Sequence, residues 1–333
     1  MRRIFGGGVV YVDLRAMDQT ADTIRIRTVR ERTTVPSRLA GLVAVIVPPV
    51  GLVTGTVLLW NRSVNWVDLV VFAAFYVPCG LGITVGWHRY FSHKSFETSA
   101  PVKALLAILG SMAMQGPLTQ WVTDHRKHHA LSDLPGDPHS PHAGRGMGMW
   151  ERARGLWHSH VGWLFSTKGL ERGPEYGKDL YDDTMVRWID RLYLLWVALS
   201  VGLPFLIGYA VFGTWQGGLQ ALVWGGLIRI FLFQHVTFSI NSICHTYGTR
   251  PFRTRDESRN VWLLALPSFG ESWHNGHHAF PASAVHGLER GQLDLSAAVI
   301  RGLERLLLVW NVKRPDPRQV ERRRAGASPA LTG

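Results

Sequence analysis

Apolar residues are gathered into four long runs in this chain of 333 residues. The runs hold almost no charged residue, and each is about as long as the roughly 20 residues that a helix needs to cross the hydrocarbon core of a membrane. Helices buried in a large soluble core are the alternative interpretation, but one chain would have to bury four of them. The pattern therefore favours four membrane-spanning helices, at residues 39–60, 66–87, 192–212 and 218–240.

Short connections divide the four runs into two pairs. Residues 61–65 join the first two runs, and residues 213–217 join the last two. Each pair is therefore predicted to be a helical hairpin whose two free ends lie on the same side of the membrane. The expected fold class is all-α and integral to the membrane, with two hairpins and a helical cap at their free ends.

Basic residues indicate which side of the membrane the free ends face. Of the 36 lysines and arginines, all but three lie in residues 1–38, 88–190 and 241–333, which flank the hairpins. Because positively charged segments stay on the cytoplasmic side, both termini and the long middle segment are predicted to be cytoplasmic. The net charge of +12 then belongs to flanks that face an anionic leaflet. We find no nucleic-acid-binding motif and expect no nucleic-acid partner.

The runs and the charge pattern divide the chain into three parts. Residues 1–37 are expected to form a basic cytoplasmic tail, residues 38–312 a membrane domain, and residues 313–333 a basic disordered tail. Met17 is an alternative start, in which case the residues before it would be an annotation artefact.

Histidine is distributed very unevenly along the chain. All 15 histidines lie between residues 88 and 286, and only His235 falls inside a predicted span. The two cysteines lie in or beside the spans, so neither a disulfide framework nor a cysteine-rich metal site is expected. Nine histidines and one asparagine form four clusters: His88 and His93; His125, His128 and His129; Asn241 and His245; and His274, His277 and His278.

The spacing within the clusters is typical of metal ligands on one face of a helix. Positions i, i+3 and i+4 lie side by side on a helix, so the three imidazoles of an H-x-x-H-H motif can converge on one point. Asn241 and His245 share a face in the same way, whereas His88 and His93 are five apart and are expected to straddle a helix end.

Imidazole suits zinc, copper, iron and nickel. Nine ligands are too many for one tetrahedral site and suit two neighbouring metal ions. We expect no ligand among the remaining six histidines, which are His139, His142, His158, His160, His235 and His286.

The same motifs resemble those of a known protein family. HRYFSH, HRKHH and HNGHH, on four spans arranged two plus two, are similar to the histidine boxes of the integral-membrane fatty acyl desaturases. The resemblance is above all to the Δ9 acyl-CoA (stearoyl-CoA) desaturase group and its bacterial relatives. NSICHTYG and SHVGWLF point to the acyl desaturase branch, and the resemblance covers residues 40–310.

The resemblance implies a non-haem di-iron centre. The nine clustered histidines would hold two iron ions, and Asn241 would hold one of them through a water molecule. Such proteins use dioxygen and two electrons to remove two hydrogens from an acyl chain, which leaves a cis double bond, here expected at Δ9. Asp124 and Glu271 would orient the imidazoles from outside the ligand set.

The resemblance also implies a tunnel for the acyl chain. Gln115, Trp121 and Thr237 would enclose its bent, reacting part, and Tyr76 and Gly80 would close its far end. The substrate would be a fatty acyl thioester or a membrane lipid.

Three questions stay open at this point. The acyl carrier is coenzyme A, acyl carrier protein or a lipid, because Thr123 stands where animal acyl-CoA desaturases have an arginine. No electron-donor motif is evident, so we expect a separate reductase with a ferredoxin or a cytochrome b5-like carrier. The alternative functions are a membrane hydroxylase or alkane-oxidising relative, and a metal-binding or metal-transport membrane protein.

Overall fold

The chain, seen in a computed structural model, is described over three long segments and several short ones: residues 3–5, 8–10, 65–142, 148–165 and 176–326, with a few positions between 46 and 53. The two N-terminal strands, β1 (Arg3–Phe5) and β2 (Gly8–Val10), pair antiparallel. Most of the first predicted span, residues 39–60, lies outside the described residues.

Among the described residues, three helices are long and apolar enough to cross a membrane, by length and composition. The first consists of α2 (Trp66–Leu81) and the π-helix η2 (Gly82–Ser92). The second is α8 (Tyr193–Phe212). They correspond to the second and third of the predicted spans.

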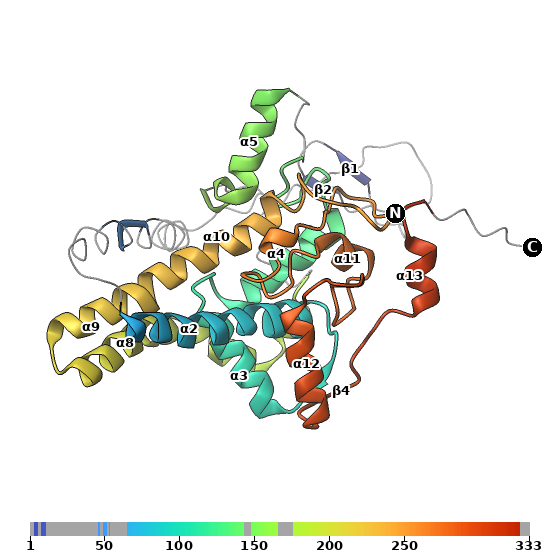
Figure 1. Cartoon of the computed structure of the whole chain (residues 1–333). Coiled ribbons are helices and arrows are strands. Elements are labelled where there is room, and N and C mark those ends of the chain that lie inside the picture. Colours follow the sequence, from blue (N-terminus) through green and yellow to red (C-terminus); the bar gives the residue numbers. More distant parts are fainter. Residues whose placement is uncertain are drawn as a thin grey trace, which may run out of the picture.

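The third long helix is built from three parts and corresponds to the last predicted span. These parts are α9 (Trp215–Ala221), the π-helix η4 (Leu222–Ile228) and α10 (Arg229–Ser242). Figure 1 shows the three long helices running side by side, with the turn between α8 and α9 at one end of the molecule.

Local chemistry explains the tight hairpin of α8 and α9. Gly213 ends α8 in the left-handed conformation, with φ of 64°, which glycine adopts without steric cost. Thr214 then caps α9, because its hydroxyl accepts a hydrogen bond from Gly217 N at 3.1 Å. Gly208 lies so close to Gly217 and Ala221 that a side chain at position 208 would collide with both. The two helices can therefore pack backbone against backbone.

The other described elements form a cap toward the opposite end of the long helices (Figure 1). They are short helices and one pair of antiparallel strands, β3 and β4. In chain order they are β3 (Glu97–Thr98), α3 (Ala100–Ser111), α4 (Leu118–Leu131), α5 (Met149–His160), η3 (Gly162–Phe165), α6 (Lys178–Tyr181), α7 (Thr184–Arg191), η5 (Trp262–Leu264), α11 (His274–Ala279), α12 (Leu295–Arg305), β4 (Val309–Trp310) and α13 (Pro317–Arg323).

Arg229 places a charge inside the third long helix, where an unpaired charge would be costly. It is fully buried, and its guanidinium donates hydrogen bonds to the carbonyls of Gly225 (3.0 Å), Met112 (3.1 Å) and Ser200 (3.1 Å) and to the Ser200 hydroxyl (2.6 Å). Met112 follows the last residue of α3, where carbonyl groups lack partners within the helix. The arginine therefore fastens the end of α3, just before the segment that carries Gln115.

The C-terminal segment contradicts part of the disordered tail expected at residues 313–333. The structure describes a helix, α13, and the Arg253 amide donates to the carbonyl of Arg323 at 2.8 Å, which binds the segment to the loop after α10. The expectation of disorder was based on the basic charge of the segment and was wrong here. Charge does not show that a distant loop supplies hydrogen-bond partners to its backbone. Residues 327–333 lie outside the described part of the chain.

Candidate metal centre

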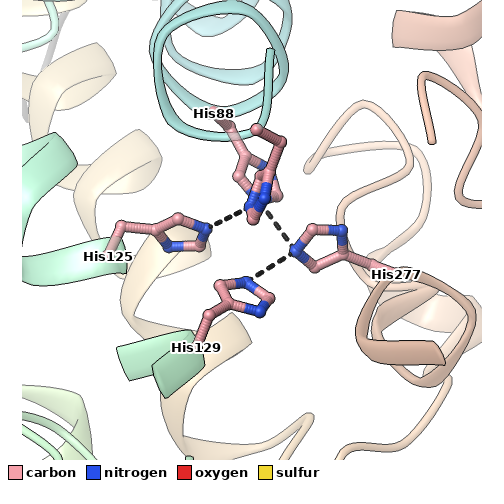
Figure 2. A group of neighbouring side chains, drawn as sticks. His88, His125, His129 and His277 are labelled. Carbon is pink, nitrogen blue, oxygen red and sulfur yellow. Dashed lines mark hydrogen bonds between the residues drawn. The ribbon is translucent and has the colours of Figure 1, made fainter. Parts of the chain in front are cut away.

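The nine clustered histidines come together in the cap as two groups of ring nitrogens. In each group the candidate ligand atoms lie within 4.8 Å of one another, close enough to share a metal ion. Figure 2 shows His88, His125, His129 and His277 pointing toward a common centre from three separate elements. The five-histidine group is His88, His93, His125, His129 and His277, and the four-histidine group is His128, His245, His274 and His278.

The π-helix η2 explains how His88 and His93 reach the same group. In a π-helix the backbone N–H bonds to the carbonyl five residues earlier. The amide of His93 donates to the carbonyl of His88 at 3.2 Å, and the two ring centroids are 5.0 Å apart. His93 follows the last residue of η2, as the expected helix end requires, but it is the wide π-helical turn that aligns the two imidazoles.

The imidazoles of each H-x-x-H-H motif do not converge on one point, contrary to the expectation from spacing. On α4, His125 and His129 join the five-histidine group, whereas His128 joins the four-histidine group. On α11 the division is reversed, because only His277 joins the five-histidine group. Neighbouring residues on a helix point about 100° apart, so adjacent histidines face different centres. Each motif therefore contributes to both groups and places them side by side.

Several Nε2 atoms in these groups face one another or lack a hydrogen-bond partner. Nε2 of His277 lies 3.0 Å from Nε2 of His88 and 2.9 Å from Nε2 of His129. Nε2 of His128 and Nε2 of His278 are buried with no hydrogen-bond partner. Convergent imidazole nitrogens fit a zinc, copper, iron or nickel ion. They do not suit calcium or magnesium, which take oxygen ligands.

Burial favours the neutral, metal-binding form of several clustered imidazoles. Loss of solvent lowers the pKa of His125, His129 and His274 well below the ordinary value, and neighbouring imidazoles lower it further. Burial also lowers the pKa of His278 to about 4, although Asp256 acts in the opposite direction. No proton therefore has to be displaced from these rings near neutral pH.

Four carboxylates bind the Nδ1 atoms of four clustered histidines. Asp133 binds His245, Asp137 binds His128 and Asp256 binds His278, each at 2.9 Å, and Glu271 binds His88. Such partners fix the orientation and tautomer of a metal-binding imidazole. Burial acts to lower the pKa of His128, but Asp137, together with Asp133 and Asp256, outweighs this effect and raises the pKa. Burial acts to raise the pKa of Asp137, but His128 lowers it to about 2.

Only part of this carboxylate shell is visible in the sequence. Glu271 is expected there, and it contacts a clustered histidine and the fully buried Arg89. Asp137 and Asp256 are missed by sequence reasoning. The GDPH stretch at residues 136–139, one of the segments similar to the desaturases, could have indicated Asp137. No local sequence pattern indicates Asp256. Asp124 is buried, and its role as an outer partner stays a prediction.

Two of the histidines that we expected not to be ligands also lie beside the groups. His139 packs against His128, with ring centroids 4.6 Å apart. His286 is fully buried, and its ring centroid is 4.3 Å from that of His277. Both therefore belong to the surroundings of the candidate centre, and their exclusion as ligands stays a prediction.

A cavity lies beside the two groups, and Trp121, Thr237 and Asn241 line it together with four of the clustered histidines. Gln115 links the first two: its amide nitrogen donates to the Thr237 hydroxyl at 2.8 Å, and its carbonyl accepts from the Trp121 indole at 3.0 Å. The three residues expected around the bent part of an acyl chain thus form one hydrogen-bonded unit next to the histidines. The apolar part of the lining includes Ile83, Phe233, Val236 and Ile240.

Tyr76 and Gly80 lie behind the wall of this cavity rather than in its described lining. The Tyr76 hydroxyl donates to the carbonyl of Pro267 at 2.8 Å, and its ring packs edge-on against Phe233, with centroids 5.4 Å apart. Phe269 fills the space beside Gly80, so a side chain at position 80 would collide with its ring. Phe233 therefore stands between Tyr76 and the cavity. A role for Tyr76 and Gly80 at the far end of the acyl chain stays a prediction.

Long apolar helices beneath a cap with two groups of buried and half-buried histidines define a membrane protein with a candidate transition-metal centre. The sequence model of the fatty acid desaturase family matches residues 64–301, which contain all nine clustered histidines. The chain belongs to the fatty acid desaturase family and is an oxidoreductase of that family. The resemblance seen in the sequence is thereby confirmed.

Three relatives illustrate the range of this similarity. The chain is 42% identical over 277 residues to the hex-5-enoyl-[acyl-carrier protein] acetylenase of Moorena producens (strain JHB). The aligned residues cover 83% of this chain and 86% of that protein. It is 40% identical over 261 residues to Delta-9 acyl-lipid desaturase 1 of Arabidopsis thaliana, covering 78% and 79%. It is 36% identical over 251 residues to the sn-1 stearoyl-lipid 9-desaturase of Anabaena variabilis, covering 75% and 85%.

Proposed function

We propose that the protein is an O2-dependent fatty acyl desaturase in which each histidine group holds one iron ion. The observation that carries this proposal is the division of nine ring nitrogens between two adjacent groups beside an apolar cavity. Two iron ions bound there would supply the oxidising power for unactivated C–H bonds, which no side chain provides. Family membership favours iron over the other metals that imidazole binds.

The nine histidines are the proposed iron ligands, and Asn241 completes the smaller set. Asn241 lines the cavity together with His128 and His274 of the four-histidine group, a position that suits an indirect contact through water. The outer carboxylates hold four of the imidazoles through Nδ1 and leave Nε2 to face the metal position. The rings of His125, His129 and His274, whose pKa burial lowers, need no change of protonation to bind.

An acyl chain in the cavity would pass the histidines along the wall formed by Trp121 and Thr237, which Gln115 joins by hydrogen bonds from outside the described lining. The hydrogen bonds among these side chains fix the shape of the wall, so that one pair of adjacent carbons is held near the histidines in a bent conformation. Loss of one hydrogen from each carbon then leaves a cis double bond. For each double bond, dioxygen, two electrons, two protons and the two acyl hydrogens form two water molecules.

We place the double bond at Δ9, by analogy with two of the relatives named above. Those relatives also support a lipid-bound acyl chain, whereas the acetylenase supports a chain on acyl carrier protein. The acetylenase adds a second possibility for the product, because the same centre acting on an existing double bond would yield a triple bond.

The proposal includes a topology and an electron donor. Residues 39–60 would be the first of four spans, and both termini and the histidine groups would lie on the cytoplasmic side because lysine and arginine flank the hairpins there. Residues 38–312 would then form the desaturase domain. Electrons would come from a separate reductase through a ferredoxin or a cytochrome b5-like carrier.

Expression in a host that supplies a reductase and a ferredoxin, followed by mass spectrometry of the fatty acids, tests the proposal. We expect new monounsaturated species that His128→Ala abolishes. New hydroxylated chains would instead identify a hydroxylase. Iron-loaded protein that consumes donor electrons and leaves every acyl chain unchanged would contradict the proposal, and a protein that moves metal across vesicles without consuming oxygen would support the transport alternative.

Supplying the same host with a monoenoic fatty acid separates a desaturase from an acetylenase. A desaturase that acts on saturated chains is expected to leave the monoenoic chain unchanged at its double bond. A triple bond at that position would assign the acetylenase reaction.

A further inference from the structure

Two consecutive residues in the loop after α10 connect the four-histidine group to the surface. Asp256 holds Nδ1 of His278 at 2.9 Å. The next residue, Glu257, donates its backbone N–H to Asp133 at 2.7 Å, and Asp133 in turn holds Nδ1 of His245 at 2.9 Å. Two proposed ligands of one metal are therefore positioned from the same short stretch of loop.

The loop segment that carries these residues, 250–259, is fastened to α11. The amide of Phe252 donates to the Asn275 side chain at 2.8 Å, and the Asn275 side chain donates back to the Phe252 carbonyl at 3.1 Å. Asn275 follows His274 directly in the third histidine motif. A molecule bound to this segment would thus contact a surface rigidly joined to the histidines.

The outward side of the segment is basic. Arg253 and Arg255 are exposed there, and so are Arg318 and Arg322 of the C-terminal segment that pairs with it. Residues 250–259 and 313–324 together, here called the basic surface, contain ten basic and four acidic side chains. The excess of positive charge suits an acidic partner.

The basic surface and the cavity approach the histidines from different sides. The described lining of the cavity includes His274 but not His278, which lies on the same helix. His278 is instead held by Asp256, next to the exposed Arg255. A partner on the basic surface would therefore not compete with an acyl chain in the cavity.

We propose that the basic surface binds an acidic one-electron carrier protein, which delivers electrons to the four-histidine group through Asp256 and His278. This inference rests on the proposed function, because each double bond requires two electrons. Two reduced carriers each lose one electron. These two electrons, two protons and the two acyl hydrogens reduce dioxygen to two water molecules. Opposite charges on the two partners would accelerate their association.

A protein carrier fits this surface better than an anionic membrane. Figure 1 shows α13 on the side of the cap, at the end of the molecule opposite to the turn between α8 and α9, and residues 250–259 are hydrogen-bonded to its last residue, Arg323. Charge on that surface is available to a partner that approaches from the aqueous side.

Donor oxidation by the iron-loaded, full-length protein tests the proposal. The protein is placed in nanodiscs of neutral phosphatidylcholine and mixed anaerobically with a reduced, acidic plant-type [2Fe–2S] ferredoxin, and the visible absorbance of the ferredoxin is followed. Arg255→Glu and Arg322→Glu are each expected to slow ferredoxin oxidation by about tenfold and to weaken its dependence on ionic strength. Both variants should oxidise dithionite, a small electron donor that needs no docking surface, at the wild-type rate. Their iron content should also equal that of the wild type.

Arg305→Glu is the matched control, because Arg305 is exposed at the end of α12 and lies outside the basic surface. It introduces the same change of charge and should oxidise ferredoxin at the wild-type rate. The second basic-surface variant keeps the test decisive if one substitution disturbs folding.

Each contrary result has a distinct meaning. If the wild type is active and both Arg255→Glu and Arg322→Glu oxidise ferredoxin at its rate, the carrier does not bind the basic surface. The proposed desaturase function would be unaffected by that result. Slowing that occurs only in nanodiscs with anionic lipid would assign the surface to the bilayer and also overturn the proposal. A wild type that binds no iron and oxidises neither donor would remove the proposed function itself.

Discussion

His277 and His278 are adjacent in the chain, yet their imidazoles serve different groups. Their ring centroids are 5.4 Å apart and the rings are nearly perpendicular, at 88°. His277 faces His88 and His129 through Nε2, whereas His278 is held at Nδ1 by Asp256. One short helix therefore contributes to both candidate metal positions. A substitution at either residue removes a candidate ligand from only one of them.

Removing either histidine is expected to release one iron ion and to retain the other. Iron analysis of purified His277→Ala and His278→Ala should give about one iron per chain instead of two, because each variant loses one ligand of one group. The Mössbauer spectra of the two variants should differ, since the retained ion has a different set of nitrogen ligands. His158→Ala, outside both groups, should keep both ions. Identical spectra for the two histidine variants would argue against two separate positions.

Loss of an outer carboxylate should weaken metal binding without removing a ligand. Asp137→Asn keeps the size of the side chain but removes the charge that holds Nδ1 of His128. We expect iron affinity, measured by competition with a chelator, to fall by about 10- to 100-fold. Asp182→Asn, at an exposed position, is the control and should bind iron like the wild type. An unchanged affinity in Asp137→Asn would mean that the packing around His128 is sufficient to orient it.

The cavity wall formed by Trp121 and Thr237, which Gln115 joins by hydrogen bonds, should determine where the double bond is placed. Thr237→Val preserves volume but removes the hydroxyl that accepts from Gln115 at 2.8 Å. The loss of one hydrogen bond costs about 1 kcal/mol, so we expect turnover to fall about fivefold. Mass spectrometry should then show more than one double-bond position in the product. Thr98→Val, which removes a surface hydrogen bond to the Leu308 carbonyl, should change neither quantity.

Phe233 is expected to limit the length of the acyl tail beyond the double bond. Its ring lines the cavity, and the Tyr76 ring lies behind it. Phe233→Ala should therefore shift the products toward longer tails, and Tyr76→Ala should do so less. Fatty acid profiles from a mixture of chain lengths measure this shift. A larger shift in Tyr76→Ala than in Phe233→Ala would mean that the chain passes Phe233 and ends at Tyr76.

Local patterns in the sequence determined the long helices and the residues of the site. Three of the predicted spans correspond to long apolar helices, because the length and polarity of a run set its preference for a hydrocarbon environment. The histidine motifs were equally visible, since four closely spaced clusters stand out from the rest of the chain. These properties depend on residues close together in sequence, so the sequence alone carries them.

Only the tertiary structure decided how those residues are used. It divided His128 from His129 between two groups and turned η2 into a π-helix that aligns His88 with His93. It also brought Asp256 to His278 and bound the C-terminal helix to the loop after α10. Each of these outcomes depends on contacts between distant segments, and the directions of side chains follow from backbone geometry that composition and spacing do not specify.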